Sequence, residues 1–423
     1  MQAINSAKNG IARGYGFFKR QERDWRVSVF RSNTHIFMHR IIDPYLSIYI
    51  IALGATATQL GLINSIGMIV GGLVAPVLGS LIDRIGVKKV YLITIFFVAV
   101  AYLLYGIAGT WVVAIIAMVA FWLGHNPSLQ ACGVICANSL SSSERATGMA
   151  LCETSSMGVL GIFAPMLGAL LVTAFGGINV DGIRPIFFIC MAFAVITFIL
   201  IFTQLSNRKW GSVNTGVNLS FFKGISEVFK KGRYLKRWIM ISTITSLPMG
   251  MAMPFRQVFA HDIKDADQYI LGMMVMASSI VPIILGIFMG RMADKLGRKK
   301  LIYASMPFVW LSNIILIWAP DTAWLVVAGA LQGFFMLSGL PERAMSRELV
   351  PPEQMGRWLG ILDFCKMIFS AGSVYLAGII WDNVGPQYVF LIIIATDILI
   401  RIPLMLGMPE TLNLDISQNG ENN

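Results

Sequence analysis

A pattern that decides the fold occurs twice in this chain, as Gly79-Ser-Leu-Ile-Asp83-Arg84-Ile-Gly86-Val-Lys88-Lys89 and as Gly290-Arg-Met-Ala-Asp294-Lys295-Leu-Gly297-Arg298-Lys299-Lys300. A constant offset of 211 residues superposes the two copies. In each copy a glycine permits close approach of another helix, an aspartate ends the helix, and basic residues follow at a membrane interface. The chain is therefore predicted to consist of two related halves, with one copy between the second and third helix of each half.

The composition around these two copies is that of an integral membrane protein. Of 423 residues, 56% are hydrophobic and 13% charged, and the mean hydropathy is +0.70. Apolar runs of about twenty residues match the length of a helix that crosses the bilayer. We expect an all-α integral membrane fold with 12 transmembrane helices arranged as two pseudo-symmetric six-helix bundles. The expected helices are 33–53, 60–82, 89–108, 111–138, 147–175, 185–205, 238–260, 268–290, 300–318, 322–346, 357–380 and 386–408.

The distribution of Lys and Arg predicts the orientation. If both termini are cytoplasmic, 26 of the 33 Lys and Arg lie in cytoplasmic segments, as the positive-inside rule requires. The formal net charge of +11 then reflects these loops, so we expect contact with anionic lipid and no nucleic-acid partner. The predicted domains are a basic segment at 1–32, a bundle at 33–205, a cytoplasmic linker at 206–236 with an amphipathic helix, a second bundle at 237–408 and a polar cytoplasmic tail at 409–423.

The duplicated stretch resembles the loop signature of the major facilitator superfamily, and the resemblance covers residues 33 to 408. It implies a secondary transporter that works by alternating access in the plasma membrane, is not an enzyme and needs no cofactor. It also implies that charge networks at the cytoplasmic ends of the helices control the conformational equilibrium. The residues expected to act in this gating are Gly79, Asp83, Arg84, Gly86, Arg145, Gly290, Asp294, Gly297, Arg298, Glu342, Arg343 and Arg357.

The fifth predicted helix resembles the glycine and proline pattern of proton-coupled exporters in the same superfamily. Gly161, Pro165 and Gly168 carry this resemblance and are expected to kink the helix. Alanine stands at 164 and 169, where the pattern prefers glycine, so a purely structural kink remains an alternative. The fourth predicted helix also departs from such exporters, because no Lys or Arg occurs between Trp111 and Leu140.

Ionisable residues inside the predicted helices must face protein or water, because their exposure to lipid is costly. Three pairs have the spacing of neighbours on one helix face, namely Arg40 with Asp43, Asp363 with Lys366, and Asp397 with Arg401. The last pair is expected to be structural. The residues predicted to act in substrate or proton coupling are Arg40, Asp43, His125, Glu153, Arg256, Asp363 and Lys366.

Asp43 is the leading candidate for the proton carrier. It lies near the middle of the first helix and precedes Pro44, which cannot donate a hydrogen bond to the Arg40 carbonyl. In the resembled family the first, fourth, seventh and tenth helices line the central cavity. A static salt bridge between Asp43 and Arg40 is the alternative.

Arg256 lies in a seventh helix interrupted by Pro248 and Pro254, with no acidic residue within four positions. It could attract an anionic cargo or could bind a partner on another helix.

A metal-binding alternative arises in the first helix. His35, His39 and Asp43 follow one another at helical spacing, which is compatible with a metal site. His35 and His39 are expected near the cytoplasmic interface instead, and no resident metal is predicted. His125 is expected to be a core or cavity histidine.

The sequence as a whole predicts proton-coupled export of a small organic compound by a monomer. Two alternatives remain, which are proton-coupled or facilitated uptake of a polar or anionic solute and, in another class, a membrane sensor or enzyme on a transporter scaffold.

Overall fold

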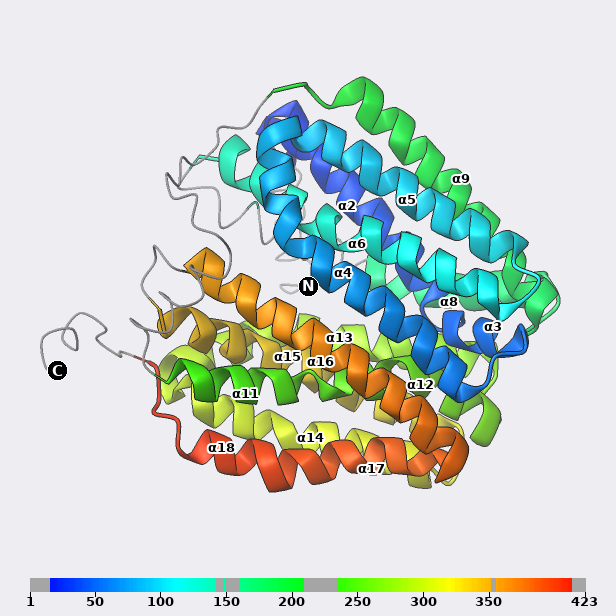
Figure 1. Ribbon diagram of the computed structural model, residues 1–423, viewed down its shortest axis with the longest axis vertical. Coiled ribbons are helices and arrows are strands. Elements are labelled where there is room, and N and C mark those ends of the chain that lie inside the picture. The colour runs from blue at the N-terminus through cyan, green and yellow to red at the C-terminus, as the bar shows by residue number, and fades with distance from the viewer. Residues whose placement is uncertain (1–15, 142–147, 149–159, 209–233, 351–354, 413–423) are drawn as a thin grey trace, which may run out of the picture.

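The computed structural model describes residues 16–141, 148, 160–208, 234–350 and 355–412. Within these ranges every regular element is a helix, and the helices form two groups that lie one above the other in Figure 1. The side chains of residues 75–84, 126–134, 137–138, 287, 356 and 357 are not described. The first group contains α2 (Arg23–Ile42), α3 (Leu46–Ala52), α4 (Ala57–Ile85), α5 (Val87–Ile107), α6 (Trp111–Ser139), α8 (Leu160–Ala174) and α9 (Val180–Gln204).

The second group begins at Leu235 and is equally helical. Its elements are α11 (Leu235–Thr245), the π-helix η2 (Pro248–Ala252), α12 (Met253–Val258), the π-helix η3 (Phe259–Ile263), α13 (Gln268–Leu296), α14 (Arg298–Trp318), α15 (Ala323–Glu348), α16 (Met355–Asn383), α17 (Pro386–Thr396), the π-helix η5 (Asp397–Arg401) and α18 (Ile402–Leu406). Nine helices in the described ranges are long and apolar enough to cross a membrane. Two shorter apolar helices, 111–125 and 160–174, accompany them.

The start of the first helix differs from the prediction. α2 begins at Arg23 rather than at residue 33, and Trp25, Ser28 and Arg31 are buried. The Arg31 guanidinium lies 4.8 Å from the centre of the Tyr91 ring, and Ser28 is hydrogen-bonded to the Tyr91 hydroxyl at 2.7 Å. Polar side chains that lower the hydropathy of this segment are thus accommodated by α5, so the segment is part of the bundle.

The predicted boundaries of the linker and the tail also change. α11 begins at Leu235, and the amphipathic helix predicted in the linker lies in residues 209–233, outside the described part. The tail packs against the second half as far as it is described. Glu410 accepts hydrogen bonds from the backbone nitrogens of Arg298 (2.8 Å) and Lys299 (3.1 Å), and Thr411 donates one to Glu348 (2.6 Å).

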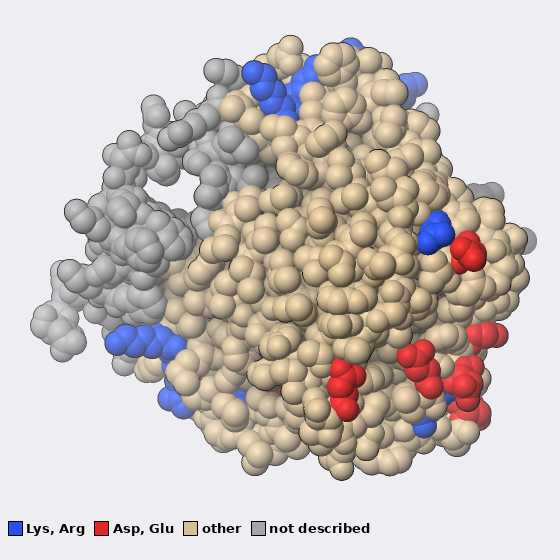
Figure 2. All heavy atoms as spheres, turned by 45° about the vertical axis from the view of Figure 1, so that its right-hand side comes forward, with Lys and Arg blue, Asp and Glu red and all other residues tan. Residues whose placement is uncertain are grey.

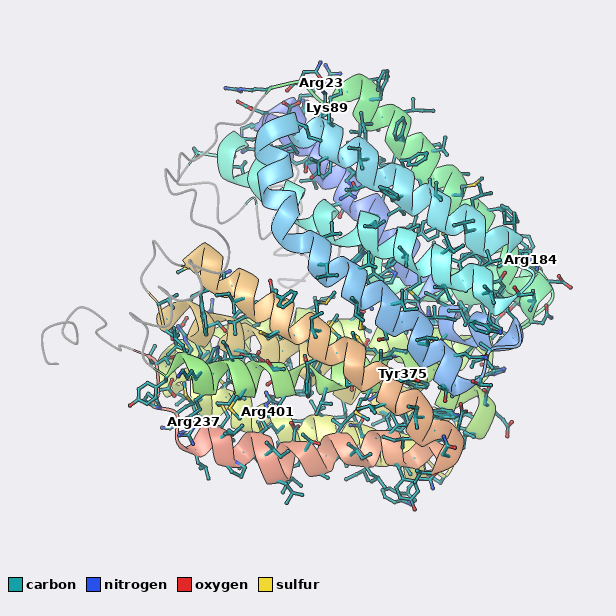
Figure 3. All side chains as sticks on the ribbon, in the orientation of Figure 1. Arg23, Lys89, Arg184, Arg237, Tyr375 and Arg401 are labelled. Atoms are coloured by element: carbon teal, nitrogen blue, oxygen red, sulfur yellow. The ribbon has the colours of Figure 1, made fainter. Side chains whose placement is uncertain are left out.

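Charge is segregated between the two ends of the helices. One end, called here the acidic end, carries the aspartates 181, 262, 265, 267, 321 and 382. The opposite basic end carries Lys88, Lys89, Arg208, Lys236, Arg237 and the run 298–300. Figure 2 shows the acidic residues of one face gathered toward one side, with some basic residues beside them and others at the far side, and Figure 3 shows Lys89 and Arg237 at one end with Arg184 toward the other.

The two halves contact each other through α4 with α16 and through α8 with α13. A Cβ atom on Gly61 of α4 would lie 2.6 Å from the Val374 carbonyl oxygen of α16. Glycine is needed here because any side chain would force the helices apart. α4 and α16 approach each other at the acidic end and diverge toward the basic end (Figure 1).

Hydrogen bonds join the halves at the acidic end. Asp382 on α16 accepts hydrogen bonds from the Thr58 backbone nitrogen (2.8 Å) and hydroxyl (2.6 Å) on α4. The Tyr45 hydroxyl donates to the Gln268 carbonyl at 3.0 Å, and the Gln268 amide donates to Thr173 at 3.0 Å. These contacts hold the halves together at the acidic end.

Candidate functional site

The first membrane-crossing segment breaks where the sequence places Asp43 before Pro44. α2 ends at Ile42 and α3 starts at Leu46, and the Asp43 N–H donates to the His39 carbonyl at 2.8 Å. The predicted contact is present, since Arg40 Nη1 lies 3.4 Å from Asp43 Oδ2. The Arg40 side chain is 13% exposed and that of Asp43 39% exposed. The carboxylate is therefore paired on one side and accessible on the other.

The corresponding segment of the second half is also irregular. Pro248 begins the π-helix η2, and Pro254 lies in the first turn of α12. This short helix places Arg256 in the protein interior, where its side chain is buried. Arg256 Nη2 donates to Asn313 Oδ1 (2.7 Å) and Gln332 Oε1 (2.8 Å), and Nη1 donates to Ser312 Oγ (3.1 Å). The interhelical partners on α14 and α15 are all uncharged.

A cavity of about 90 Å³ lies between the two halves and is lined by both broken segments. Its polar wall is formed by side chains from α2, the α2–α3 break, α12, α13 and α15, namely Arg40, Asp43, Arg256, Gln257, Ser278 and Gln332. Three residues singled out in the sequence, Arg40, Asp43 and Arg256, are thus brought to one site. Among the described residues, His125, Asp363 and Lys366 do not line this cavity, and Glu153 lies outside the described part of the chain.

The remaining wall of the cavity is apolar. It consists of Met253, Met274, Val275, Gly329, Phe335 and Met336. Methionine side chains are flexible and polarizable, so such a wall can adapt to ligands of different shape. The cavity therefore combines two guanidinium groups and one carboxylate with an adaptable apolar surface.

The predicted pair of Asp363 with Lys366 is wrong. Lys366 Nζ lies 2.7 Å from Glu342 Oε1, which joins α16 to α15, while the Asp363 side chain is exposed. Glu342 is buried, and a buried carboxylate needs a cationic partner more than an exposed one does. Arg343, the neighbour of Glu342, is exposed and donates from Nε to the Gly339 carbonyl at 3.2 Å.

His125 belongs to a histidine cluster rather than to the cavity wall. Its Nδ1 lies 3.0 Å from Nε2 of His35, and its ring centre lies 5.5 Å from that of His39 and 5.1 Å from that of Phe121. No group of three or more histidine, cysteine, aspartate or glutamate side chains in the described part of the chain has a geometry that could hold a metal ion. The metal-binding alternative gains no support from these residues.

The glycine and proline pattern of α8 lies at the contact between the halves. A Cβ on Gly168 would lie 2.5 Å from the Ile41 carbonyl oxygen of α2, and one on Gly272 of α13 would lie 3.0 Å from the Pro165 carbonyl oxygen. Pro165 is inside the helix, and Gly161 is buried. These small residues let α8 pack closely against both α2 and α13.

The second signature loop forms a charge network at the basic end. Arg298 pairs with Asp294 and with Glu348 of α15, the latter at 3.3 Å. Gly297 has φ +104° and Gly86 of the first loop has φ +86°, a conformation that favours glycine. A Cβ on Gly290 would meet no atom of the described residues within 4 Å, so the close approach expected there stays a prediction.

The structure leaves several predicted residues undescribed. Arg145 and Glu153 lie outside the described ranges, and the side chains and surroundings of Gly79, Asp83, Arg84 and Arg357 are not described. The sequence interpretation in turn missed Ser312, Asn313 and Gln332, which hold Arg256, and Glu348 and Glu410, which hold the second signature loop. For Ser312, Asn313 and Gln332, the available signal was Arg256 itself, an arginine within a membrane helix that has no acidic neighbour in the sequence.

Comparison with known proteins identifies the family. The profile of the Major Facilitator Superfamily matches residues 33–265 and 239–410. The chain belongs to this superfamily. It is a secondary transporter and not an enzyme.

Sequence relatives in the superfamily include drug exporters. The chain is 26% identical over 367 residues to the class H tetracycline resistance protein of Pasteurella multocida, covering 80% of this chain and 86% of that protein. It is 25% identical over 348 residues to a PmrA homolog of Lactococcus lactis named as a multi-drug resistance efflux pump, covering 79% and 81%.

Solved structures of low sequence identity share the fold. A mutant of the nucleoside transporter NupG superposes with a TM-score of 0.76 at 16% identity, covering 91% of this chain and 99% of that one. A D-xylose-proton symporter superposes with a TM-score of 0.70 at 13% identity, covering 92% and 98%.

Proposed function

We propose that this major facilitator superfamily member exports a small organic compound in exchange for protons, and that Asp43 carries the coupling proton. The observation that carries the proposal is the cavity between the halves, where Asp43 lies beside Arg40 and 39% of its side chain is exposed. A carboxylate can serve as a carrier only if water reaches it and if its protonation is linked to a change in its surroundings. The exposure of Asp43 to the cavity supports the first condition, and its position between the two halves, which move in alternating access, supports the second.

The proposed topology has twelve membrane crossings, with the basic end in the cytoplasm. The paired elements α2–α3, α11–η2–α12–η3 and α17–η5–α18 each count as one crossing, and α4, α5, α6, α8, α9, α13, α14, α15 and α16 as one each. The positive-inside rule supports this orientation, since the basic residues gather at one end. We propose a plasma membrane location with both termini cytoplasmic and with all these roles within one monomer.

Alternating access is the proposed mechanism. The hydrogen bonds of Asp382 with Thr58 and of Tyr45 with Gln268 would close the acidic, outward end. Rocking of the halves would break them while the basic ends approach each other. In this scheme the network of Asp294, Arg298 and Glu348 positions the second signature loop, and the Gly161, Pro165 and Gly168 pattern forms the surface on which the halves turn.

The direction of transport is proposed from the relatives. The class H tetracycline resistance protein and the PmrA homolog are both named for drug resistance or efflux. The adaptable methionine and phenylalanine wall of the cavity suits amphipathic compounds. Export is therefore favoured over uptake.

The test compares driven transport with passive exchange. Purified protein in liposomes is given a proton gradient and a panel of tetracycline and amphipathic dyes, and the same panel is followed at equal pH. We expect Asp43→Asn to bind and exchange cargo but to lose accumulation driven by the gradient. Lys236→Gln, a change of an exposed residue on α11, is the matched control and should accumulate cargo like the wild type. Gradient-driven accumulation that persists in Asp43→Asn would eliminate Asp43 as the carrier.

A second candidate function is proton-coupled uptake of an anionic solute. Arg256 favours it, because a buried guanidinium with uncharged partners lines the cavity. Accumulation inside right-side-out vesicles on an inward proton gradient would identify uptake, and depletion would identify export.

A further inference from the structure

The charges that line the cavity do not balance. Among the described residues that line the cavity, Arg40 and Arg256 contribute two positive charges and Asp43 is the single acidic residue. Asp43 lies 3.4 Å from Arg40, so these two groups neutralise each other when both are ionised. One positive charge, that of Arg256, is left in excess.

The contacts of Arg256 orient its guanidinium without neutralising it. Its three acceptors belong to a serine, an asparagine and a glutamine, at 2.7 to 3.1 Å. Its Nε–H is buried and has no acceptor among the described residues. A charge removed from water is costly unless an opposite charge compensates it. The described contacts of Arg256 therefore leave its positive charge without a compensating negative charge, which a purely structural contact would be expected to provide.

One of these partners, Ser312, is itself held by a further hydrogen bond. The Ser312 hydroxyl donates to the Ala328 carbonyl at 2.6 Å, which ties α14 to α15 behind the guanidinium. Gln332 lies on the cavity wall next to Arg256. Such a frame holds a guanidinium in one orientation before a ligand arrives, which reduces the entropic cost of binding.

We propose that the transported compound is an amphipathic monoanion and that Arg256 is its counter-ion. This inference rests on the proposed function, because it describes the cargo of the same cavity. A carboxylate or comparable anionic group would bind Arg256, and the apolar part would contact Met253, Met274 and Phe335. With a monoanion bound and Asp43 ionised, the charges of the cargo and of the described residues that line the cavity sum to zero.

The sign of the cargo charge has a consequence for energetics. Export of a monoanion in exchange for a proton moves net positive charge inward in every cycle, so an inside-negative membrane potential drives it. Uptake of the same monoanion with one proton moves no net charge. The dependence of transport on potential therefore separates the two directions for an anionic cargo.

The test is a binding measurement with pairs of ligands that differ only in charge. Naphthaleneacetate, phenylbutyrate and ibuprofen are each compared with the corresponding primary amide, by calorimetry on the detergent-solubilised full chain at one pH. We expect at least one acid to bind the wild type about tenfold or more tightly than its amide, the range of a charge-assisted hydrogen bond. Arg256→Gln should remove this preference, and Lys236→Gln should keep it.

The proposal would be overturned if the wild type bound every acid and its amide with equal affinity. It would also be overturned if the wild type bound none of the acids. So would an unchanged preference in a folded Arg256→Gln protein. If Arg256→Gln does not fold, Arg256→Lys keeps the charge but loses the planar fork, and it should reduce the preference without abolishing it. This equilibrium measurement needs no proton gradient, so its outcome is independent of the Asp43→Asn transport test. The preference for an anion can be absent while Asp43 still proves to be the proton carrier, and the preference can be present while Asp43 does not.

Discussion

Two arginine–aspartate pairs within the helices look alike in the sequence but have different surroundings in the fold. Arg40 and Asp43 lie at a helix break beside the cavity, with Asp43 39% exposed. Asp397 and Arg401 lie in the π-helix η5 at 3.5 Å, with both side chains about 5% exposed, and Trp310 Nε1–H donates to Asp397 at 2.9 Å. The Asp43 carboxylate is thus accessible from the cavity, whereas the second pair is enclosed and bonded to a neighbouring helix. Exposure, rather than spacing along the helix, therefore distinguishes the pair that we propose to carry protons from the pair that we expect to be structural.

The largest effect is expected at the enclosed pair. Arg401→Leu leaves the Asp397 carboxylate buried without its cation, which should lower the free energy of unfolding by about 3–5 kcal/mol. Chemical denaturation in detergent micelles measures this. The double variant Asp397→Leu/Arg401→Leu should recover most of the loss. A change below about 1 kcal/mol in Arg401→Leu would show that the pair is not structural.

The cavity pair should behave in the opposite way. Asp43→Asn removes a partly exposed charge, so the denaturation midpoint should change little, while accumulation driven by a proton gradient should fall by about tenfold or more. The vesicle assay and the denaturation assay are run on the same preparation. A large loss of stability together with a loss of binding would mean that Arg40 and Asp43 form a static salt bridge like the enclosed pair.

A smaller effect is expected where the halves meet at the acidic end. Asp382→Asn weakens the hydrogen bonds from Thr58, and the population opened at the acidic end should rise by about tenfold, the size of one charged hydrogen bond. A cysteine at Ser278, which lines the cavity, reports this opening through its rate of labelling by a membrane-impermeant maleimide. Thr322→Val, at the acidic end of α15, serves as the control. An unchanged labelling rate in Asp382→Asn would indicate that Asp382 does not hold the halves together.

The smallest effect is expected in the first signature loop. Asp83 lies near the basic end of α4, so Asp83→Asn should slow cargo exchange by about fivefold, typical of a weak conformational coupling. Cargo affinity should stay within about twofold. Loss of cargo binding in a folded Asp83→Asn protein would contradict a role in gating and move Asp83 to the binding site.

The elements that were predicted correctly depend on local chemistry. Proline at 44 removes a backbone donor, so the break after Ile42 could be foreseen, and the spacing of Arg40 and Asp43 on one helix face made their contact predictable. The same rule failed for Lys366, because a carboxylate 24 positions away on α15 is buried beside it. The start of α2 was missed because Arg23, Arg26 and Arg31 lower the hydropathy of a segment that the bundle nevertheless buries.

The sequence by itself determined the family, the duplication and the gathering of Lys and Arg at one end of the helices, because each depends on residue order, apolar length or charge count along the chain. Only the tertiary structure decided which charges meet. Arg40, Asp43 and Arg256 come from segments about 210 residues apart, and they share one cavity only because α2 and α12 face each other across the two halves. The partners of Arg256 were equally beyond the sequence, since serine, asparagine and glutamine on other helices carry no local sign of the guanidinium they bind. Hydrogen bonds from these uncharged groups matter to Arg256 because water is excluded around it, and this burial arises only when the helices assemble.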